Sequence, residues 1–388
     1  MCLWCFGAPA PDRSLLKEPV VRILLTGSTG FVGGAVAADM AARGLLASCV
    51  FLVRSDSPEA ARTRVVETLI RFGVAPDVAQ GVTAEQMLCG DLTGVAEFAD
   101  HPLLSHLTHV LHCAALATFS NNPKIWASNV DGTLALAKAV IARSKLTRWL
   151  QVGTAMCCGP GWPSPVQESW ETGSQDDAHL VPYTRSKLAV ELALKALPGL
   201  PLVVARPSIV VGHSVLGCAP SPSIFWVFRM AFALERFTCA PDERIDIIPV
   251  DWCASTLVGL CLAERLAHDL YHVCAGMQRS NTFTELDLAY AAASGQAPIA
   301  PRYQQVAVED LRSLVPLFQE RLGRVNRLLI LRALTLYGAF AELNYVFDNA
   351  RLQAEGFALP PPLADYMAQC VRTSEGVPMT EQMAYDFK

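Results

Sequence analysis

The first half of the chain alternates short apolar runs with helical patterns, and this alternation constrains the fold most strongly. Apolar strands are expected at 21–26, 49–54, within 85–92, and at 109–115, 148–154 and 201–207. Helical patterns occupy 31–44, 58–72, 123–144 and the stretch that begins near Tyr183. Short strands without polar alternation, each followed by a helix, are typical of a parallel sheet covered on both faces. The sequence therefore predicts an α/β fold with a doubly wound parallel sheet.

The turn after the first strand, "TGSTGFVG", carries the pattern G-x-x-G-x-x-G. The first glycine permits a tight turn, the second lets the backbone approach a pyrophosphate, and the third lets helix and strand pack closely. Phosphates would then lie at the helix N-terminus, where free N–H groups favour an anion. A structural glycine turn is the alternative, but the strand before and the helix after it favour dinucleotide binding. The sequence thus predicts a Rossmann-type domain, with a binding loop of Gly27, Ser28, Thr29, Gly30, Phe31, Val32 and Gly33.

The second strand ends in Arg54 rather than in an acidic residue. An acid at this position holds the ribose 2′-hydroxyl of NAD, whereas an arginine accommodates the 2′-phosphate of NADP. Arg64 on the next helix supplies a second cation, although Asp56 lies close to Arg54 in sequence. Both arginines are alternatively solvated charges that flank a helix. We interpret the pattern as favouring NADPH as the cofactor.

Three residues form the expected catalytic set. Thr154 ends the fifth strand, and ligands of open α/β sheets bind at the carboxyl ends of the strands. Tyr183 and Lys187 are four residues apart and therefore share one helix face. The ammonium is expected to lower the pKa of the tyrosine, which would give a proton to a carbonyl oxygen while Thr154 holds the developing oxyanion. The alternative for Thr154 is a threonine that only satisfies backbone groups.

Taken together, these motifs resemble those of the extended short-chain dehydrogenases/reductases over about residues 21–255. The shared stretches are "TGSTGFVG", "GDL", "HCAA", "NVDGT", "YTRSK" and "RPSIVVG", in the order of the family. The resemblance implies that Asp91 and Leu92 lie by the adenine, and that Ala114 and Ala115 line the cofactor. It also implies that Asn129 supports the active site, that Thr154, Tyr183 and Lys187 are catalytic, and that the nicotinamide is flanked by Pro207, Ser208 and Ile209.

Other stretches resemble the branch of thioester reductases and fatty acyl-CoA reductases, with male-sterility-type NAD-binding domains. These stretches are "FLVRSDSPEAARTRV", "IDIIPVDWCASTLVG" and "YVFDNARLQAEGF". The resemblance implies NADPH-dependent reduction of an acyl-CoA or acyl-carrier-protein thioester to an aldehyde, and in some members to the alcohol. Segments 223–237 and 328–347 either line an acyl groove or belong to the core. Residues 155–182 match no branch, so the reaction type is better supported than the substrate.

The whole chain is expected to divide into a loose arm at 1–19, an NADP-binding domain at 20–206 and a mostly helical substrate lobe at 207–388. Strands are expected near 245–250 and 270–275 within the last part. Two other functions stay open within the superfamily, an alcohol or ketone dehydrogenase and a nucleotide-sugar epimerase or dehydratase. A non-catalytic NADPH-binding protein is a third alternative, but it would be expected to lack part of the catalytic set.

The overall composition excludes several classes of protein. With 52% hydrophobic and 17% charged residues, the chain is a globular protein rather than a disordered one. A net charge of −5 argues against binding to nucleic acid. The 13 cysteines are scattered and odd in number, and Cys2 and Cys5 lack a second pair, so we expect reduced thiols in the cytoplasm and no metal. No spanning helix is expected; a buried or interfacial helix at 328–347 leaves peripheral membrane contact open.

Overall fold

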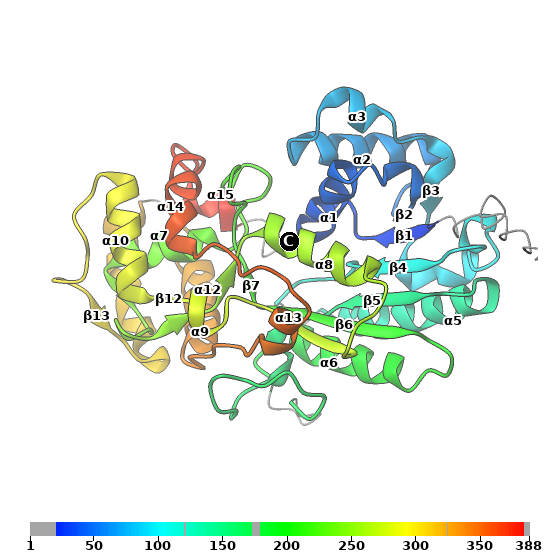
Figure 1. The fold of residues 1–388 in the computed structure, drawn as a ribbon. Helices are drawn as coiled ribbons and strands as arrows, with labels where there is room; N and C mark the ends of the chain where they lie inside the picture. The colour runs from blue at the N-terminus through cyan, green and yellow to red at the C-terminus, as the bar shows by residue number, and fades with distance from the viewer. Residues whose placement is uncertain (1–20, 120–121, 173–178, 324, 384–388) are drawn as a thin grey trace, which may run out of the picture.

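The computed structural model describes residues 21–119, 122–172, 179–323 and 325–383. The expected arm at 1–19, including Cys2 and Cys5, lies outside these ranges. Within them, the chain forms one large sheet with helices on both faces, and a mostly helical lobe beside it (Figure 1).

Seven parallel strands form the main sheet, in the order β11-β6-β5-β4-β1-β2-β3. Their bounds are β1 Ile23–Thr26, β2 Cys49–Val53, β3 Met87–Cys89, β4 His109–His112, β5 Arg148–Val152, β6 Leu202–Pro207 and β11 Leu270–Val273. The six strands expected in the first half of the chain are therefore confirmed. The strand order reverses between the neighbours β1 and β4, and ligands of such sheets bind in the crevice at that point. The predicted Rossmann-type fold is confirmed.

Helices cover the sheet on both sides because successive residues of a strand point to opposite faces. Ile23 and Leu25 of β1 face the core that contains α1 (Phe31–Ala42) and α2 (Pro58–Arg71). Leu24, between them, faces the core formed with α5 (Thr133–Arg143) and α6 (Pro182–Lys195). The five-residue helix α3 (Pro76–Gln80) follows α2. The helix expected at 123–144 comprises α4 (Lys124–Trp126), a π-helical turn (η6, Ala127–Gly132) and α5.

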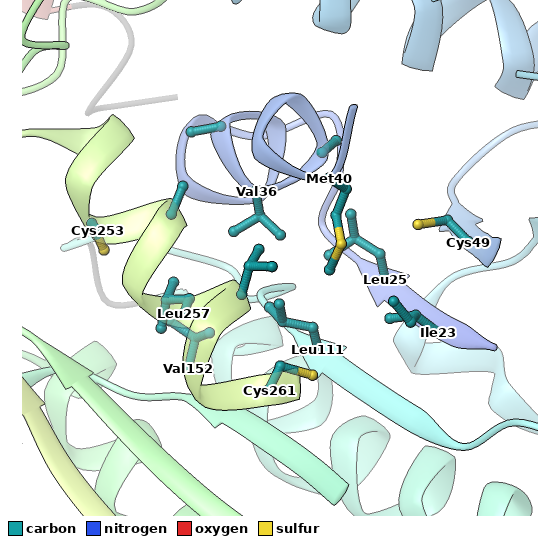
Figure 2. Packing of buried hydrophobic residues seen from close by; sticks show 14 of the residues in the cluster. Ile23, Leu25, Val36, Met40, Cys49, Leu111, Val152, Cys253, Leu257 and Cys261 are labelled. Carbon is teal, nitrogen blue, oxygen red and sulfur yellow. The ribbon is translucent and has the colours of Figure 1, made fainter. Parts of the chain in front are cut away.

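The chain returns to the main sheet after residue 207. Helix α8 (Val250–Leu262) packs against α1, with Leu257 of α8 near Val36 of α1 and Val152 of β5 (Figure 2). The strand expected near 270–275 is β11, and it pairs with the edge strand β6 of the main sheet. The strands expected near 245–250 are the short β9 (Arg244–Ile245) and β10 (Ile247–Ile248). The expected domain boundary after residue 206 would therefore separate elements that share one hydrophobic core.

The lobe beside the sheet has its own core of aromatic and aliphatic side chains. Four of its longer helices supply much of this core: α7 (Phe225–Leu234), α10 (Phe283–Ser294), α12 (Arg327–Ala341) and α14 (Leu363–Arg372). Shorter helices complete it or lie at its border with the sheet: α9 (Gly276–Arg279), α11 (Val315–Leu322), α13 (Ala350–Ala354) and α15 (Met379–Met383). Small two-stranded pairings join β7 (Ile209–Val210) to β10, β12 (Asn281–Thr282) to β9, and β13 (Gln304–Gln305) to β8 (Arg236–Phe237).

In the part of the chain that the structure describes, no helix combines the length and apolar character that a membrane crossing requires. The 328–347 segment forms α12, whose residues Ile330, Leu334 and Tyr337 are buried in the second core. The described residues also contain no group of three or more potential metal ligands. The cysteines of these ranges are free and most are buried.

Candidate active site

The glycine turn closes tightly over the carboxyl end of β1. Gly27 adopts φ +73°, and a Cβ atom there would lie 2.8 Å from the backbone nitrogen of Ala114. The N–H of Gly30 donates to the carbonyl of Gly27 at 2.9 Å, which places the start of α1 directly above the turn. A Cβ on Gly33 would lie 2.2 Å from that same carbonyl oxygen. Both positions therefore require glycine, the first for its backbone angle and both for close backbone approach.

The residues present fit a dinucleotide at this edge of the sheet. The hydroxyl of Ser28 is fully buried in the turn and has no hydrogen-bond partner among the residues that the structure describes, so it is available to a ligand. Phe31 and Val32 open α1, whose first N–H groups have no partner within the helix. On the neighbouring strand end, the Ala114 N–H donates to the Thr26 hydroxyl at 3.0 Å. Ala114 and Ala115 follow β4 and are half-buried, and Thr29 lies in the turn.

Arg54, Arg64 and Asp91 lie together at the ends of β2 and β3. The Arg64 guanidinium donates to the backbone carbonyl of Arg54. Arg54 Nε is 3.7 Å from an Asp91 oxygen, and 74% of the Arg54 side chain is exposed. The pKa of Asp91 is lowered despite partial burial, because Thr93 and Arg54 stabilise its ionised form. Two exposed cations thus stand where β2 ends, and Leu92, next to Asp91 in the chain, is buried.

Thr154 lies two residues after the end of β5 and caps the short 3-10 turn η7 (Ala155–Cys158). Its hydroxyl accepts a hydrogen bond from the N–H of Met156 at 3.3 Å. This contact is the backbone-satisfying role of a strand-end threonine, and it leaves the hydroxyl hydrogen free to donate elsewhere. Helix α6 packs against η7, so the threonine lies near the helix that carries the tyrosine and the lysine.

Tyr183 and Lys187 occupy the first two turns of α6, which begins at Pro182. Lys187 is 3% exposed, and its Nζ donates to the Val152 carbonyl at the end of β5 at 2.6 Å. The same ammonium lies 5.9 Å from the centre of the Tyr183 ring. The structure therefore brings the tyrosine and lysine together at the carboxyl edge of the sheet, where β5 passes into Thr154.

The protonation states differ from the expectation that Lys187 lowers the pKa of Tyr183. Burial instead raises the pKa of the Tyr183 phenol, and the nearby Cys157 and Glu191 act in the same direction. Burial lowers the pKa of Lys187, while Glu191 opposes that change. Desolvation outweighs the neighbouring ammonium because the charged phenolate loses more solvation than the lysine restores. The tyrosine is thus held as a phenol, the state that a proton donor requires.

Asn129 connects the loop after β4 to helix α6. Its side-chain oxygen accepts from the Leu116 N–H at 2.7 Å, and its Nδ2 donates to the Ser186 hydroxyl at 3.0 Å. Ser186 in turn donates to the carbonyl of Tyr183 at 2.7 Å. Asn129 lies in the π-helical turn η6 and is buried. It therefore fixes the position of the tyrosine's helical turn relative to the cofactor edge.

A buried ion pair lies behind the lysine, and the sequence reasoning did not identify it. Glu191 is one turn beyond Lys187 on α6, and its carboxylate binds Arg206 of β6 at 2.8 and 2.9 Å. Both side chains are fully buried. A Cβ on Gly153 would lie 2.0 Å from the other Glu191 oxygen, so glycine is required beside the carboxylate. The only sequence signal is the helical spacing in "YTRSKLAVE".

Arg206 also forms hydrogen bonds to the segment 155–182, which resembles no branch of the superfamily. It donates to the Ser169 carbonyl at 3.3 Å and to the Thr172 hydroxyl at 3.1 Å. Earlier in the same segment, Val166 forms an isolated parallel bridge with Phe347. The described part of the 155–182 segment thus packs between β6 and the chain near 345–348, while residues 173–178 lie outside the described ranges.

Pro207, Ser208 and Ile209 lie where β6 ends and the second lobe begins. Ser208 is buried, and its N–H donates to the Val273 carbonyl at 3.0 Å. The Ile209 N–H donates to the carbonyl of Asp246. The Asp246 carboxylate accepts backbone N–H groups of Ala275, Gly276 and Phe347 and joins three separate segments at this edge.

An apolar pocket opens beside Thr154 and reaches into the second lobe. Its lining includes Ile209 and Met156, whose N–H donates to the Thr154 hydroxyl. Helix α7 contributes Ile224 at its start together with Val227, Phe228 and Ala231, and α12 contributes Tyr337, Phe340 and Ala341. Segments 223–237 and 328–347 thus both line this pocket and belong to the second core; an acyl chain in the pocket stays a prediction. The pocket is narrow, with about 80 Å³ of space that the centre of a water molecule can reach.

The sheet order, the glycine turn and the Tyr183–Lys187 helix define an NAD(P)-binding domain of the extended short-chain dehydrogenase/reductase class. Residues 25–257 match the family described as male sterility protein, and the chain belongs to this family. The predicted resemblance to the male-sterility-type NAD-binding branch is thereby confirmed.

The curated relatives are longer proteins that match most of this chain. The chain is 24% identical to the non-canonical nonribosomal peptide synthetase FrzA of Cladobotryum sp, over 76% of this chain and 30% of that protein. It is 25% identical to the aldehyde reductase lnaA of Aspergillus flavus, over 80% of this chain and 32% of that protein. The chain thus spans about a third of the length of these relatives.

A solved structure shows the same fold over nearly the whole chain. This is the terminal R domain from the myxalamid PKS-NRPS biosynthetic pathway, with a TM-score of 0.72 and 21% identity. The match covers 92% of this chain and 91% of that domain. At this identity the likeness concerns the fold, including both the sheet and the second lobe.

Proposed function

We propose that this protein reduces an acyl thioester to an aldehyde with NADPH, and that a second reduction of the aldehyde to the alcohol is open to the same site. The observation that carries the proposal is a half-buried phenol, Tyr183, near Lys187 and near the turn from Thr154 to Met156, where Met156 lines an apolar pocket. The pocket suits the acyl part of the substrate because its interior presents mainly hydrocarbon. The names of the relatives, a peptide synthetase and an aldehyde reductase, support carbonyl reduction on tethered or free substrates.

The residues of the chain have distinct tasks in this reaction. A nicotinamide dinucleotide bound at the glycine turn supplies the hydride. Thr154 donates its free hydroxyl hydrogen to the thioester carbonyl oxygen and stabilises the negative charge that develops there. Tyr183 donates its phenolic proton to the same oxygen. The resulting hemithioacetal loses thiol when its hydroxyl proton passes to the sulfur, so that one hydride and one proton yield one aldehyde and one thiol.

Lys187 keeps the proton donor effective. Its buried ammonium lies near the Tyr183 ring and stabilises the phenolate that remains after the proton has left. The Val152 carbonyl and the Glu191 carboxylate one turn away favour the charged form of the lysine in this desolvated position. Asn129 and Ser186 hold the first turn of α6 while the charge changes.

The choice of NADPH is proposed from Arg54 and Arg64. The largely exposed Arg54 and the Arg64 side chain that contacts its carbonyl stand at the end of β2, where the 2′ position of the adenosine ribose lies in this fold class. Replacing either with alanine should weaken NADPH binding roughly tenfold or more while changing NADH binding little, since each arginine contributes charge-assisted hydrogen bonds. Fluorescence titration of both nucleotides tests this. Equal losses for NADPH and NADH would contradict it.

The reaction is tested by mixing the protein with NADPH and a long-chain acyl-CoA or an acyl-carrier-protein thioester. We expect NADPH consumption together with release of free thiol, measured by absorbance and by a thiol reagent. The two thioesters are separate arms, because CoA and a carrier protein present the same bond on different supports. If no thiol is released while ketones or alcohols are turned over, an alcohol or ketone dehydrogenase replaces the thioester reductase.

A further inference from the structure

Phe119 joins the loop after β4 to the core of the second lobe. Among the described residues, it is the only one before residue 207 that belongs to the hydrophobic cluster of that lobe. It follows the loop segment that Asn129 holds through both backbone groups of Leu116, and Thr118 next to it is buried. Its half-buried ring therefore has a defined place although it lies in a loop.

The Phe119 ring contacts both Tyr183 and the part of α12 that lines the apolar pocket. Its centre is 6.1 Å from that of Tyr183. It is also 5.6 Å from the centre of Tyr337 and 5.7 Å from that of Phe340, both on α12. Tyr337 and Phe340 line the pocket, and Tyr337 contacts Trp226 of α7 edge-on. Aromatic packing at these distances is favourable and resists displacement of the ring.

The position of the Phe119 ring bears on the acyl carbon next to the reacting carbonyl. If the carbonyl oxygen is held by Thr154 and Tyr183, the adjacent acyl carbon lies within one bond of the carbonyl carbon and therefore close to the tyrosine. A chain that runs on into the pocket passes Met156 and the α12 wall. A straight chain needs only the width of a methylene there, whereas a branch at the adjacent carbon widens the chain close to Tyr183, and the Phe119 ring packs against that tyrosine.

We propose that Phe119 is a specificity-determining residue that selects acyl groups unbranched at the carbon next to the carbonyl. This inference rests on the proposed function in that it assumes a carbonyl substrate held by Thr154 and Tyr183. It names the substrate class more narrowly, as straight-chain acyl groups. Phe119 acts by excluding volume and takes no part in proton transfer.

The experiment compares octanoyl-CoA with 2-methyloctanoyl-CoA in the wild-type protein and in the variants Phe119→Ala and Phe119→Leu. The ratio of kcat/KM for the straight over the branched substrate should fall about tenfold or more in Phe119→Ala, since one methyl group in a shaped pocket changes discrimination by roughly 10- to 200-fold. Phe119→Leu should give an intermediate ratio. Phe357→Ala is the matched control, because Phe357 is also half-buried but packs on Gly259 of α8; its ratio should equal that of the wild type.

A second measurement does not depend on turnover. Binding of octanamide and 2-methyloctanamide to the NADPH-loaded protein, followed by calorimetry, should show the same change in the ratio of Kd values. Absence of thiol release by the wild type from both the CoA and the carrier-protein thioester would overturn the proposed function, whereas the amide ratios would still decide the role of Phe119. An unchanged ratio in both variants, in folded protein by thermal melting, would make Phe119 a packing residue only and would overturn the inference.

Discussion

At the residue scale, the proposed chemistry depends most directly on Tyr183. Replacing it with phenylalanine removes the proton donor and leaves the ring contact with Phe119 in place. Turnover should fall by roughly 10²- to 10⁴-fold, the range for loss of a positioned acid, with NADPH affinity nearly unchanged. Tyr303→Phe is the control, since that hydroxyl donates only to the Cys239 carbonyl in the second lobe. A Tyr183→Phe protein with normal turnover would remove the tyrosine from the mechanism.

A second prediction at this scale concerns the buried ion pair between Glu191 and Arg206. In Glu191→Gln, Arg206 keeps its charge in a fully buried place without a carboxylate partner. Removing one member of a buried pair costs about 3–5 kcal/mol, so the urea midpoint should drop strongly. The control is Asp100→Asn, which disrupts the pair with Arg143 where 92% of the Asp100 side chain is exposed. That change should cost less than about 1 kcal/mol; equal losses in the two variants would contradict the assignment.

At the scale of elements, Glu168 joins the segment before α6 to β11 and α13. Its carboxylate accepts the backbone N–H groups of His272 at 2.8 Å and Arg351 at 2.7 Å. Burial raises the pKa of Glu168 to about 7 from an ordinary value of 4.5, although these two hydrogen bonds oppose the change. The folded protein therefore holds this proton more tightly than the unfolded chain, which gives a contribution to stability that is complete below pH 4.5 and is lost as pH rises through 7.

The corresponding prediction uses Glu168→Gln, which keeps an acceptor oxygen and cannot ionise. The free energy of unfolding of this variant relative to wild type should increase by up to about 3 kcal/mol between pH 4.5 and 8, following the shift in the wild-type pKa. Urea titrations at several pH values measure the difference. A constant difference across this range would show that the carboxyl group does not titrate within it.

The glycine turn is the other element whose geometry the site requires. Helix α1 begins so close to the turn that Gly33 has no room for a Cβ atom beside the Gly27 carbonyl. Gly34, the next residue, has its own constraint, because a Cβ there would meet the Phe72 and Thr68 side chains of the α2 segment. One helix is thus packed tightly against the cofactor turn at one residue and against its neighbouring helix at the next.

At the scale of the whole molecule, the expected domain at 20–206 shares its core with later parts of the chain. Helix α8 covers β4, β5 and α1, and β11 pairs with β6. A fragment of residues 20–206 would expose the apolar face of α1, including Val36 and Met40. We expect it to unfold without a cooperative transition in urea, followed by circular dichroism, while the full chain unfolds cooperatively. A cooperative, native-like fragment would support the simpler division.

The sheet, the glycine turn and the helix that begins near Tyr183 were predictable because each depends on residues close together in the chain. Apolar strands, helix starts and glycine positions follow from local backbone preferences, and the order of the strands then follows from general rules for crossover connections. The proximity of the three expected catalytic residues could be inferred for the same reason, since Thr154 lies just past the end of β5 and Tyr183 and Lys187 share one face of α6. Their roles remain predictions for the experiments above.

Long-range packing accounts for what these local patterns missed. Phe119 meets Tyr337 across more than 200 residues, and Glu191 meets Arg206 through the stacking of α6 on the sheet. The pKa of Tyr183 depends on how deeply the folded chain buries it, so the adjacent lysine alone suggested the wrong direction. Strand pattern and glycine spacing specify where a dinucleotide binds, because backbone geometry is local. The pocket, the buried charges and the aromatic wall arise only when distant segments exclude water from one another.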